Sequence, residues 1–299
     1  MTNPSVFNYF KMINILVTGA NGQLGLTLKS IQENYAMYTF FFTKKSELDI
    51  TNSSKIENFI VKNHIDILIN CAAYTLVDKA EDEKELANKI NHIAVKNLAK
   101  ISKKYSIKLI HISTDYVFDG TSKIPYVETA ITNPQNVYGI SKLKGERAIQ
   151  EINPLNSIII RTSWLYAEFG SNFVKTILKI SNDKDKIQVV SDQIGSPTYA
   201  RDLAETILQI IPKIKNENTA VYHFSNKGSC SWYNFAEEIV RLSNHHCKVA
   251  PIEAVKFNSK AKRPKYSLLN TNKIQNTFGI NIPNWKDSLK DCVCELENK

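Results

Sequence analysis

Short apolar runs alternate with longer polar segments over the first 165 residues of the chain. The apolar runs are rich in β-branched and aromatic residues, which favour strands. They predict strands over residues 13–18, 38–43, 65–71, 108–113 and 157–162. The segments between them, such as 53–63 and 84–105, carry apolar residues at helical spacing. Apolar strands that alternate with helices indicate a parallel sheet covered on both faces, which is a Rossmann-type doubly wound α/β fold.

The pattern changes after about residue 165, where predicted strands become rare. The later part predicts helices over 172–181, 199–211 and 232–242, a strand over 221–225 and a last helix beyond Pro283. Ser231 is placed to cap the helix that follows it. We therefore predict a main domain over residues 12–165 and a smaller lobe over 166–299, with some exchange of chain between the two.

Charge and cysteine usage narrow the classes of protein. The formal net charge is +9, but the basic residues are scattered, so a phosphorylated small substrate explains the charge as well as nucleic acid would. We expect no nucleic-acid partner and, because no apolar run is long enough to span a bilayer, no membrane. The five cysteines include no CxxC pair, so neither disulfides nor a zinc site are indicated.

The N-terminal segment does not have the pattern of a signal peptide. We expect a short, poorly ordered extension ahead of the first strand, with Met12 as an alternative start. Because no export signal is seen, the reducing cytoplasm is the expected location.

A glycine-rich turn follows the first predicted strand and opens the first helix. Gly19, Gly22 and Gly25 allow a tight turn, a close approach of backbone to a pyrophosphate, and close packing of helix on sheet. The free N–H groups at the start of the helix then receive the anion. The spacing is GxxGxxG rather than GxGxxG, and glycine turns also occur without ligands. Its place after an apolar strand nevertheless favours NAD(P) binding by residues 12–165.

Lysines, rather than an acidic residue, follow the second predicted strand. An acid there would hold the ribose 2′-hydroxyl of NAD, whereas Lys44 or Lys45 could meet the 2′-phosphate of NADPH. Both lysines could also simply face solvent. We expect NADPH as the cofactor, with NADH as the alternative. Further contacts, beside the adenine and at the end of the third strand, are predicted for Asp49, Ile50, Ala72, Ala73 and Tyr74.

Tyr138 and Lys142 lie one helical turn apart in a segment between the fourth and fifth predicted strands. Carbonyl reduction needs a proton donor, and a nearby ammonium and the cofactor's charge are expected to lower the pKa of a tyrosine from about 10. Thr114, at the end of the fourth strand, can donate a hydrogen bond to the substrate oxygen. A YxxxK pair is common on surface helices, but this context favours a catalytic site.

Several longer motifs accompany these residues. They are Ser-Thr-Asp-Tyr-Val-Phe-Asp-Gly (113–120), Tyr-Gly-Ile-Ser-Lys (138–142), Arg-Thr-Ser-Trp-Leu-Tyr (161–166) and Asp-Gln-Ile-Gly-Ser-Pro-Thr (192–198). With the glycine turn, they resemble the dTDP-4-dehydrorhamnose reductase family of extended short-chain dehydrogenases/reductases. The resemblance covers nearly the whole chain from Met12. The glycine turn and the YxxxK pair belong to the wider superfamily, whereas the other motifs are more specific.

The resemblance implies reduction of the 4-keto group of dTDP-4-dehydro-β-L-rhamnose to dTDP-L-rhamnose, the last step of dTDP-L-rhamnose biosynthesis. Tyr138 matches the family's proton donor and Lys142 its ribose-binding lysine. Thr114 and Asp115 match substrate contacts, and Trp164 matches an aromatic residue that lines the sugar pocket. The smaller lobe over 166–299 is expected to be mainly substrate-binding. The implied cofactor contacts are Asn21, Gly22, Gln23, Leu24, Asp49, Ile50, Ala73, Tyr74 and Thr75.

One departure from the family concerns magnesium. Some members bind this ion at a dimer interface through glutamates, and the resemblance places Thr27 and Arg201 at two of those positions. Two missing carboxylates leave too few hard oxygen ligands. We predict no magnesium-bridged dimer, and a monomer or another homodimer instead.

Other conspicuous residues have ordinary explanations. Trp232, Tyr233 and Phe235 are expected to pack in the second lobe, and His111 to be a core histidine. The adjacent His245 and His246 are expected to face solvent. The segment 263–265, Arg-Pro-Lys, could bind substrate phosphates or be a structural loop.

Two alternatives to the reductase remain. One is another nucleotide-sugar reductase or an epimerase on the same scaffold, and an epimerase would keep NAD bound and need no external reductant. The other is a non-catalytic regulatory subunit that resembles the β subunit of methionine adenosyltransferase. Such a subunit could lose the proton donor, whereas this chain keeps Thr114, Tyr138 and Lys142.

Overall fold

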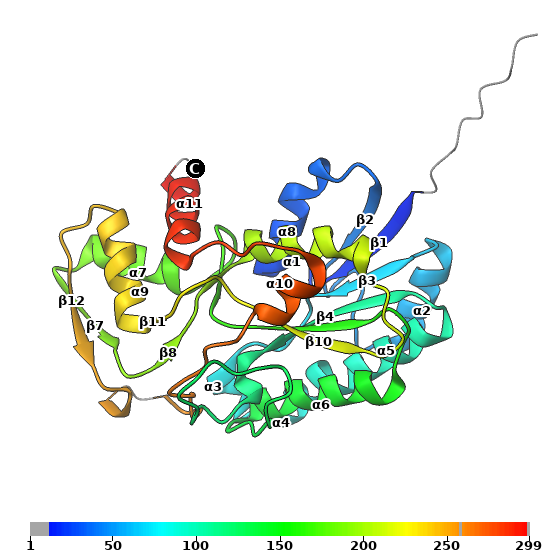
Figure 1. The fold of residues 1–299 in the computed structure, drawn as a ribbon, viewed down its shortest axis with the longest axis horizontal. Coiled ribbons are helices and arrows are strands. Elements are labelled where there is room, and N and C mark those ends of the chain that lie inside the picture. Colours follow the sequence, from blue (N-terminus) through cyan, green and yellow to red (C-terminus); the bar gives the residue numbers. More distant parts are fainter. Residues whose placement is uncertain (1–11, 257–258, 298–299) are drawn as a thin grey trace, which may run out of the picture.

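The computed structural model describes residues 12–256 and 259–297. At its centre is a parallel sheet of six strands in the order β10-β5-β4-β3-β1-β2 (Figure 1). These strands are β1 (Ile13–Thr18), β2 (Tyr38–Thr43), β3 (Ile67–Asn70), β4 (Lys108–Thr114), β5 (Ile158–Thr162) and β10 (Ala220–Phe224). The Rossmann-type α/β fold is confirmed. The extension predicted before Met12 lies outside the described residues.

Helices cover both faces of this sheet because its strands are apolar on both sides. In β1, Ile15 and Val17 pack in one core cluster and Leu16 in the other. One layer contains α1 (Gln23–Ile31), α8 (Ala200–Ile210) and α10 (Asn272–Phe278). The other contains α2 (Ser53–Lys62), α5 (Val95–Lys104) and α6 (Val137–Ile152). Figure 1 shows the two layers above and below the strands.

The helix predicted over 84–105 is interrupted. It consists of α4 (Lys84–Asn88), one π-helical segment η2 (Lys89–Ala94) and α5. The buried Asn91 in η2 accepts a hydrogen bond from the Tyr74 N–H at 2.8 Å and donates to the Tyr74 carbonyl at 3.0 Å. The wider turn therefore ties this helix to the loop that follows β3.

The second lobe packs three helices around its own apolar cluster. They are α7 (Phe173–Asp183), α9 (Trp232–Leu242) and α11 (Trp285–Glu297). Three two-stranded sheets, which the sequence pattern did not predict, complete it: β6 (Leu165–Tyr166) with β9 (Thr198–Tyr199), β7 (Lys186–Val190) with β12 (Lys248–Ile252), and β8 (Ile194–Gly195) with β11 (Cys230–Ser231). Ser231 caps α9 as predicted, through a capping box with Asn234.

The later half of the chain also contributes to the main sheet. β10 pairs with β5, α8 packs on α1, and α10 packs on β10. Elements that follow residue 165 therefore extend the main sheet and cover one of its faces. The remaining short elements are α3 (Val77–Ala80) and the 3-10 turns η1 (Gln32–Asn34), η3 (Asp115–Val117), η4 (Ile211–Lys213) and η5 (Ala254–Lys256). Among residues 12–256 and 259–297, no helix has the length and apolar character needed to cross a membrane.

Candidate active site

A cavity of about 870 Å³ runs along the carboxyl ends of the central strands. Residues at or just beyond the ends of β1 to β5 line it, namely Gly19, Lys44, Cys71, Thr114 and Thr162. Ligands of open α/β sheets bind at this edge, next to the place where the strand order reverses. Here the chain runs from β1 outward to β2 and then returns to β3 on the other side of β1.

Seventeen of the predicted site residues meet at this cavity. They are Gly19, Asn21, Gly22, Gln23, Leu24, Gly25, Lys44, Asp49, Ile50, Ala72, Ala73, Thr75, Thr114, Asp115, Tyr138, Lys142 and Trp164. Tyr74 does not line it. Its hydroxyl group donates to Glu83 at 2.8 Å, and its backbone is held by Asn91. Tyr74 therefore supports the loop rather than facing the cavity.

The glycine turn brings the backbone of three segments together. Gly19 has a φ of +71°, and a Cβ there would lie 2.6 Å from the Ala72 nitrogen. A Cβ on Gly25 would lie 2.6 Å from the Gly19 carbonyl oxygen. Helix α1 starts at Gln23, its N-cap residue Gly22 provides no side-chain cap, and its first turn has no acidic residue. Its free N–H groups therefore face the cavity in the arrangement that binds a pyrophosphate, so the site fits a dinucleotide.

The other end of the turn is fixed by contacts to the second lobe. The Gln23 amide donates to the Leu165 carbonyl at 3.2 Å and accepts from Asn172 at 3.0 Å.

Lys44 is 46% exposed and lies 3.5 Å from Glu47. It is therefore free enough to turn toward a phosphate at the cavity's edge.

Helix α6 carries the Tyr138 and Lys142 pair. Asn136 caps this helix by accepting a hydrogen bond from the Gly139 N–H at 2.8 Å, which places Tyr138 in the first turn. The Lys142 ammonium donates to the Ile112 carbonyl at 2.6 Å and lies 3.3 Å from His111 Nε2. Burial lowers the pKa of Lys142 to about 8. His111 is a core histidine, as predicted, but it also contacts the candidate catalytic lysine.

The pKa of Tyr138 differs from the sequence-based expectation. Burial raises it to about 12, and a hydrogen bond with Thr114 lowers it only in part. Lys142 does not offset the effect of burial on this pKa. Its nitrogen contacts the Ile112 carbonyl and His111 on β4. Burial likewise raises the pKa of Asp115, which Thr114 Oγ1 contacts at 3.1 Å, to about 6.

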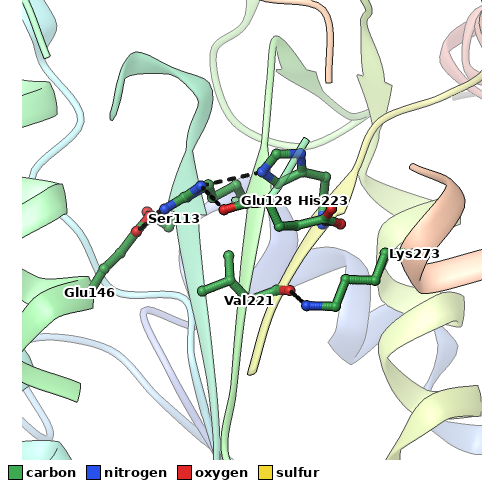
Figure 2. A network of polar contacts seen from close by, with 7 residues as sticks. Ser113, Glu128, Glu146, Val221, His223 and Lys273 are labelled. Atoms are coloured by element: carbon green, nitrogen blue, oxygen red, sulfur yellow. Dashed lines mark hydrogen bonds and ion pairs between the residues drawn. The ribbon is translucent and has the colours of Figure 1, made fainter. Parts of the chain in front are cut away.

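A buried ion pair fixes α6 against the sheet. Arg161 on β5 donates to both carboxylate oxygens of Glu146, which lies one turn after Lys142, with the shortest distance 2.6 Å. Glu146 also accepts from Ser113, which lines the cavity. Figure 2 shows this network, in which His223 lies 3.4 Å from the arginine and hydrogen-bonds through its own backbone N–H to Glu128. The ion pair therefore links α6, which carries Tyr138 and Lys142, to the ends of β4 and β5.

Two tryptophans form the second lobe's wall of the cavity. Trp164 and Trp232 are stacked, with ring centroids 3.6 Å apart. Gly195 makes room for this stack, since a Cβ there would lie 2.8 Å from the Trp164 ring. Thr198 donates to the Trp164 carbonyl at 3.2 Å. The motif 192–198 therefore positions the motif 161–166.

Trp232 and the 263–265 segment depart from the simple expectations. Trp232 packs on Phe173 in the lobe, as predicted, but it also lines the cavity, which the sequence did not indicate. Arg263 forms an ion pair with Asp78 at 2.6 Å and does not line the cavity. His245 is half-buried, and its Nδ1 lies 2.8 Å from the Ser181 hydroxyl. The prediction that His245 faces solvent is therefore wrong, whereas His246 is exposed.

The two positions considered for magnesium have other surroundings. Thr27 is buried in α1, and its hydroxyl group donates to the Gln23 carbonyl at 2.8 Å. Arg201 pairs with Glu205 at 3.2 Å and lies 3.8 Å from Glu295. Within the described ranges, no group of three or more His, Cys, Asp or Glu side chains is placed to hold a metal ion. The absence of a magnesium-bridged dimer stays a prediction.

Comparison with known proteins matches this chain over almost its full length. The family model described as "RmlD substrate binding domain" matches residues 13–298. A dTDP-4-dehydrorhamnose reductase of Aggregatibacter actinomycetemcomitans is 40% identical over 289 residues, covering 94% of this chain and 98% of the relative.

Solved structures agree with that match. The dTDP-4-dehydrorhamnose reductase of Clostridium acetobutylicum is 42% identical with a TM-score of 0.90, covering 95% of this chain and 100% of that one. The Bacillus anthracis dTDP-4-dehydrorhamnose reductase, solved in complex with NADP, is 40% identical with a TM-score of 0.89, covering 95% and 99%. The chain therefore belongs to the RmlD substrate binding domain family, together with these dTDP-4-dehydrorhamnose reductases.

Proposed function

We propose that this protein reduces the 4-keto group of dTDP-4-dehydro-β-L-rhamnose to give dTDP-L-rhamnose, with NADPH as the reductant and NADH as the alternative. The observation that carries the proposal is the arrangement of the cavity. The uncapped start of α1 lines the same cavity as Thr114, Tyr138 and the Trp164–Trp232 stack. A dinucleotide bound along the sheet edge would thus reach a site that holds a sugar.

The chain's own residues supply binding and proton transfer. The bound nicotinamide would supply the hydride for the sugar's C4. The Thr114 hydroxyl group is hydrogen-bonded to Tyr138 and donates to Asp115 Oδ1 at 3.1 Å. When substrate is bound it would turn this proton from Asp115 to the oxygen on which negative charge develops. Tyr138 keeps its proton at neutral pH, because burial raises its pKa to about 12, and can therefore donate it to that oxygen. Asp115 and the tryptophan stack would hold the sugar in place.

The choice of NADPH rests on the residues after β2. Lys44 and Lys45 line the cavity there, and Asp49 and Ile50 line it beside them. We propose that Lys44 binds the 2′-phosphate. Replacing Lys44 by alanine should reduce the preference for NADPH over NADH in kcat/KM by roughly tenfold, as expected for one charge-assisted contact. An unchanged ratio would mean that the lysine serves only as a solvated surface residue.

The test is reductase activity of a matched pair of variants. Tyr138→Phe should lower kcat by about 10²-fold or more, because it removes the proton donor, while NADPH still binds. The control Tyr105→Phe removes a hydroxyl group on the surface, where it contacts Glu57, and should keep wild-type activity. Activity retained by Tyr138→Phe would refute the assigned role. Identifying the product separates this function from another nucleotide-sugar reductase or epimerase, and an inactive wild type would favour the regulatory role.

We further propose that the reaction takes place in the cytoplasm. None of the five cysteines, all of which lie in the described part of the chain, forms a disulfide, which suits a reducing compartment. The oligomeric state is proposed to be a monomer or a homodimer that does not depend on magnesium, which size measurement with magnesium and with chelator would test.

A further inference from the structure

Three buried polar side chains form a row that ends at Lys142. Thr18, Asn70 and His111 are in register on the neighbouring strands β1, β3 and β4. Thr18 Oγ1 donates to Asn70 Oδ1 at 2.7 Å, and Asn70 Nδ2 lies 3.0 Å from His111 Nδ1. His111 Nε2 then lies 3.3 Å from Lys142 Nζ. These four residues are at most 2% exposed, so water does not replace their contacts.

The row has a direction because Asn70 presents its side-chain carbonyl oxygen to Thr18 and its amide nitrogen to His111. The Thr18 hydroxyl group donates its proton to Asn70 Oδ1. An amide nitrogen only donates, so Nδ1 of the ring must accept. Burial and the nearby Lys142 hold the pKa of His111 well below its usual value, so the ring is neutral. Its single proton is then on Nε2, which faces the lysine.

We propose that Thr18, Asn70 and His111 are positioning residues that present an N–H donor to Lys142 and so set the pH at which this lysine loses its charge. An ammonium group has only donors and meets the Nε2–H unfavourably, whereas an uncharged amine accepts from it. The amine keeps its own N–H bond to the Ile112 carbonyl at 2.6 Å. The row therefore favours the uncharged form of Lys142.

Other groups around Lys142 act on the same equilibrium. Burial favours the uncharged amine and lowers the pKa of Lys142 to about 8, whereas Glu146 on α6 and Cys71 after β3 act in the opposite direction. Tyr138 and Asp115 line the same cavity. The consequence for turnover rests on the proposed function. The charged form of Lys142 is the stronger donor to the nicotinamide ribose that this lysine is expected to hold, so the row would set the alkaline limit of the reaction.

The first test measures the ring tautomer directly and needs no turnover. The chain has six histidines, so the ring nitrogen resonances of the cofactor-free full-length protein can be assigned, with His111→Gln identifying the His111 signals. We expect the Nε2–H tautomer of a neutral ring. Observation of the Nδ1–H tautomer or of a charged ring at neutral pH would overturn the proposal, whatever the enzyme's activity.

The second test uses two matched threonine variants. Thr18→Val removes the hydroxyl group that donates to Asn70 Oδ1, so the amide can turn and His111 can shift its proton to Nδ1. His111 Nε2 can then accept from the ammonium. The alkaline limb of the kcat/KM profile should then move up by about one pH unit, the size of one hydrogen-bond change. Thr43→Val is the control, because Thr43 pairs in register with Thr18, is also buried, and donates to the Val17 carbonyl instead.

The outcomes are distinguishable. The proposal would be overturned if the alkaline limb of the kcat/KM profile of Thr18→Val stays in place or moves to lower pH. It would also be overturned if Thr43→Val shifts this limb by the same amount. A wild-type protein without reductase activity would refute the proposed function, while the tautomer measurement still decides the arrangement of the row. If Thr18→Val does not fold, the wild-type tautomer likewise decides it.

Discussion

The buried ion pair between Glu146 and Arg161 predicts a large loss of stability when one charge is removed. Their side chains are 1% and 5% exposed. In Glu146→Leu, Arg161 would keep His223 and the Glu128 carbonyl oxygen, each at 3.4 Å, and the Phe118 ring, whose centroid lies 5.2 Å from Cζ, but no carboxylate among these partners. Removal of one partner of a buried pair costs about 3–5 kcal/mol, because the other charge stays buried without compensation. At roughly 2–4 °C per kcal/mol for a chain of this class, the melting temperature should fall by roughly 6–20 °C.

Denaturant unfolding of Glu146→Leu, Arg161→Met and the double variant measures this cost. The double variant should lose less than the sum of the single variants, because no isolated charge remains. Glu205→Leu is the control, since its partner Arg201 is 41% exposed and the pair should contribute at most about 1 kcal/mol. A loss below about 1 kcal/mol for Glu146→Leu, or strictly additive losses, would refute this reasoning.

Three other perturbations have defined outcomes. Gly25→Ala places a Cβ 2.6 Å from the Gly19 carbonyl oxygen and should displace the pyrophosphate site. NADPH binding should weaken roughly tenfold or more in a fluorescence titration, as expected for such a displacement. Unchanged affinity would contradict the role of the turn. Trp232→Ala removes the ring stacked on Trp164 and should raise the KM for the nucleotide sugar roughly tenfold, with a smaller effect on kcat. An unchanged KM would mean that Trp232 serves only as a core residue. Burial lowers the pKa of His223 from 6.5 to about 3, so the unfolded chain binds more protons between these values and stability should fall as the pH drops through that window. The lowered pKa of His111 changes stability with pH in the same direction, and the pKa of Asp115, raised to about 6, acts in the opposite direction. His223→Gln should flatten the pH dependence of the unfolding free energy. An unchanged slope would contradict the assignment.

The sheet and most helices could be predicted because their signals are local. The apolar runs of β1 and β2 have the predicted bounds, and the register of a parallel sheet then brings Gly19, Thr114 and Thr162 to one edge. Tyr138 and Lys142 could be placed on one helical face from their spacing alone. Ser231 could be identified as a cap because its partner Asn234 is three residues away.

Contacts between distant segments could not be predicted in this way. Nothing near Gly195 in the sequence shows that its missing Cβ makes room for Trp164, or that Trp232 stacks on Trp164. The π-helical segment at Asn91 follows from its bonds to Tyr74, which lies in another loop. The raised pKa of Tyr138 depends on burial by the whole fold, whereas the sequence showed only the nearby lysine.

The central claim is that the cavity brings a reduced nicotinamide to the 4-keto carbon of a dTDP-linked sugar beside Tyr138. The most direct measurement supplies the protein with NADPH carrying deuterium at the transferable C4 position and with dTDP-4-dehydro-β-L-rhamnose, and examines the product by NMR. The account predicts dTDP-L-rhamnose with deuterium at the sugar's C4. Absence of deuterium from that carbon, or a product other than dTDP-L-rhamnose, would contradict it.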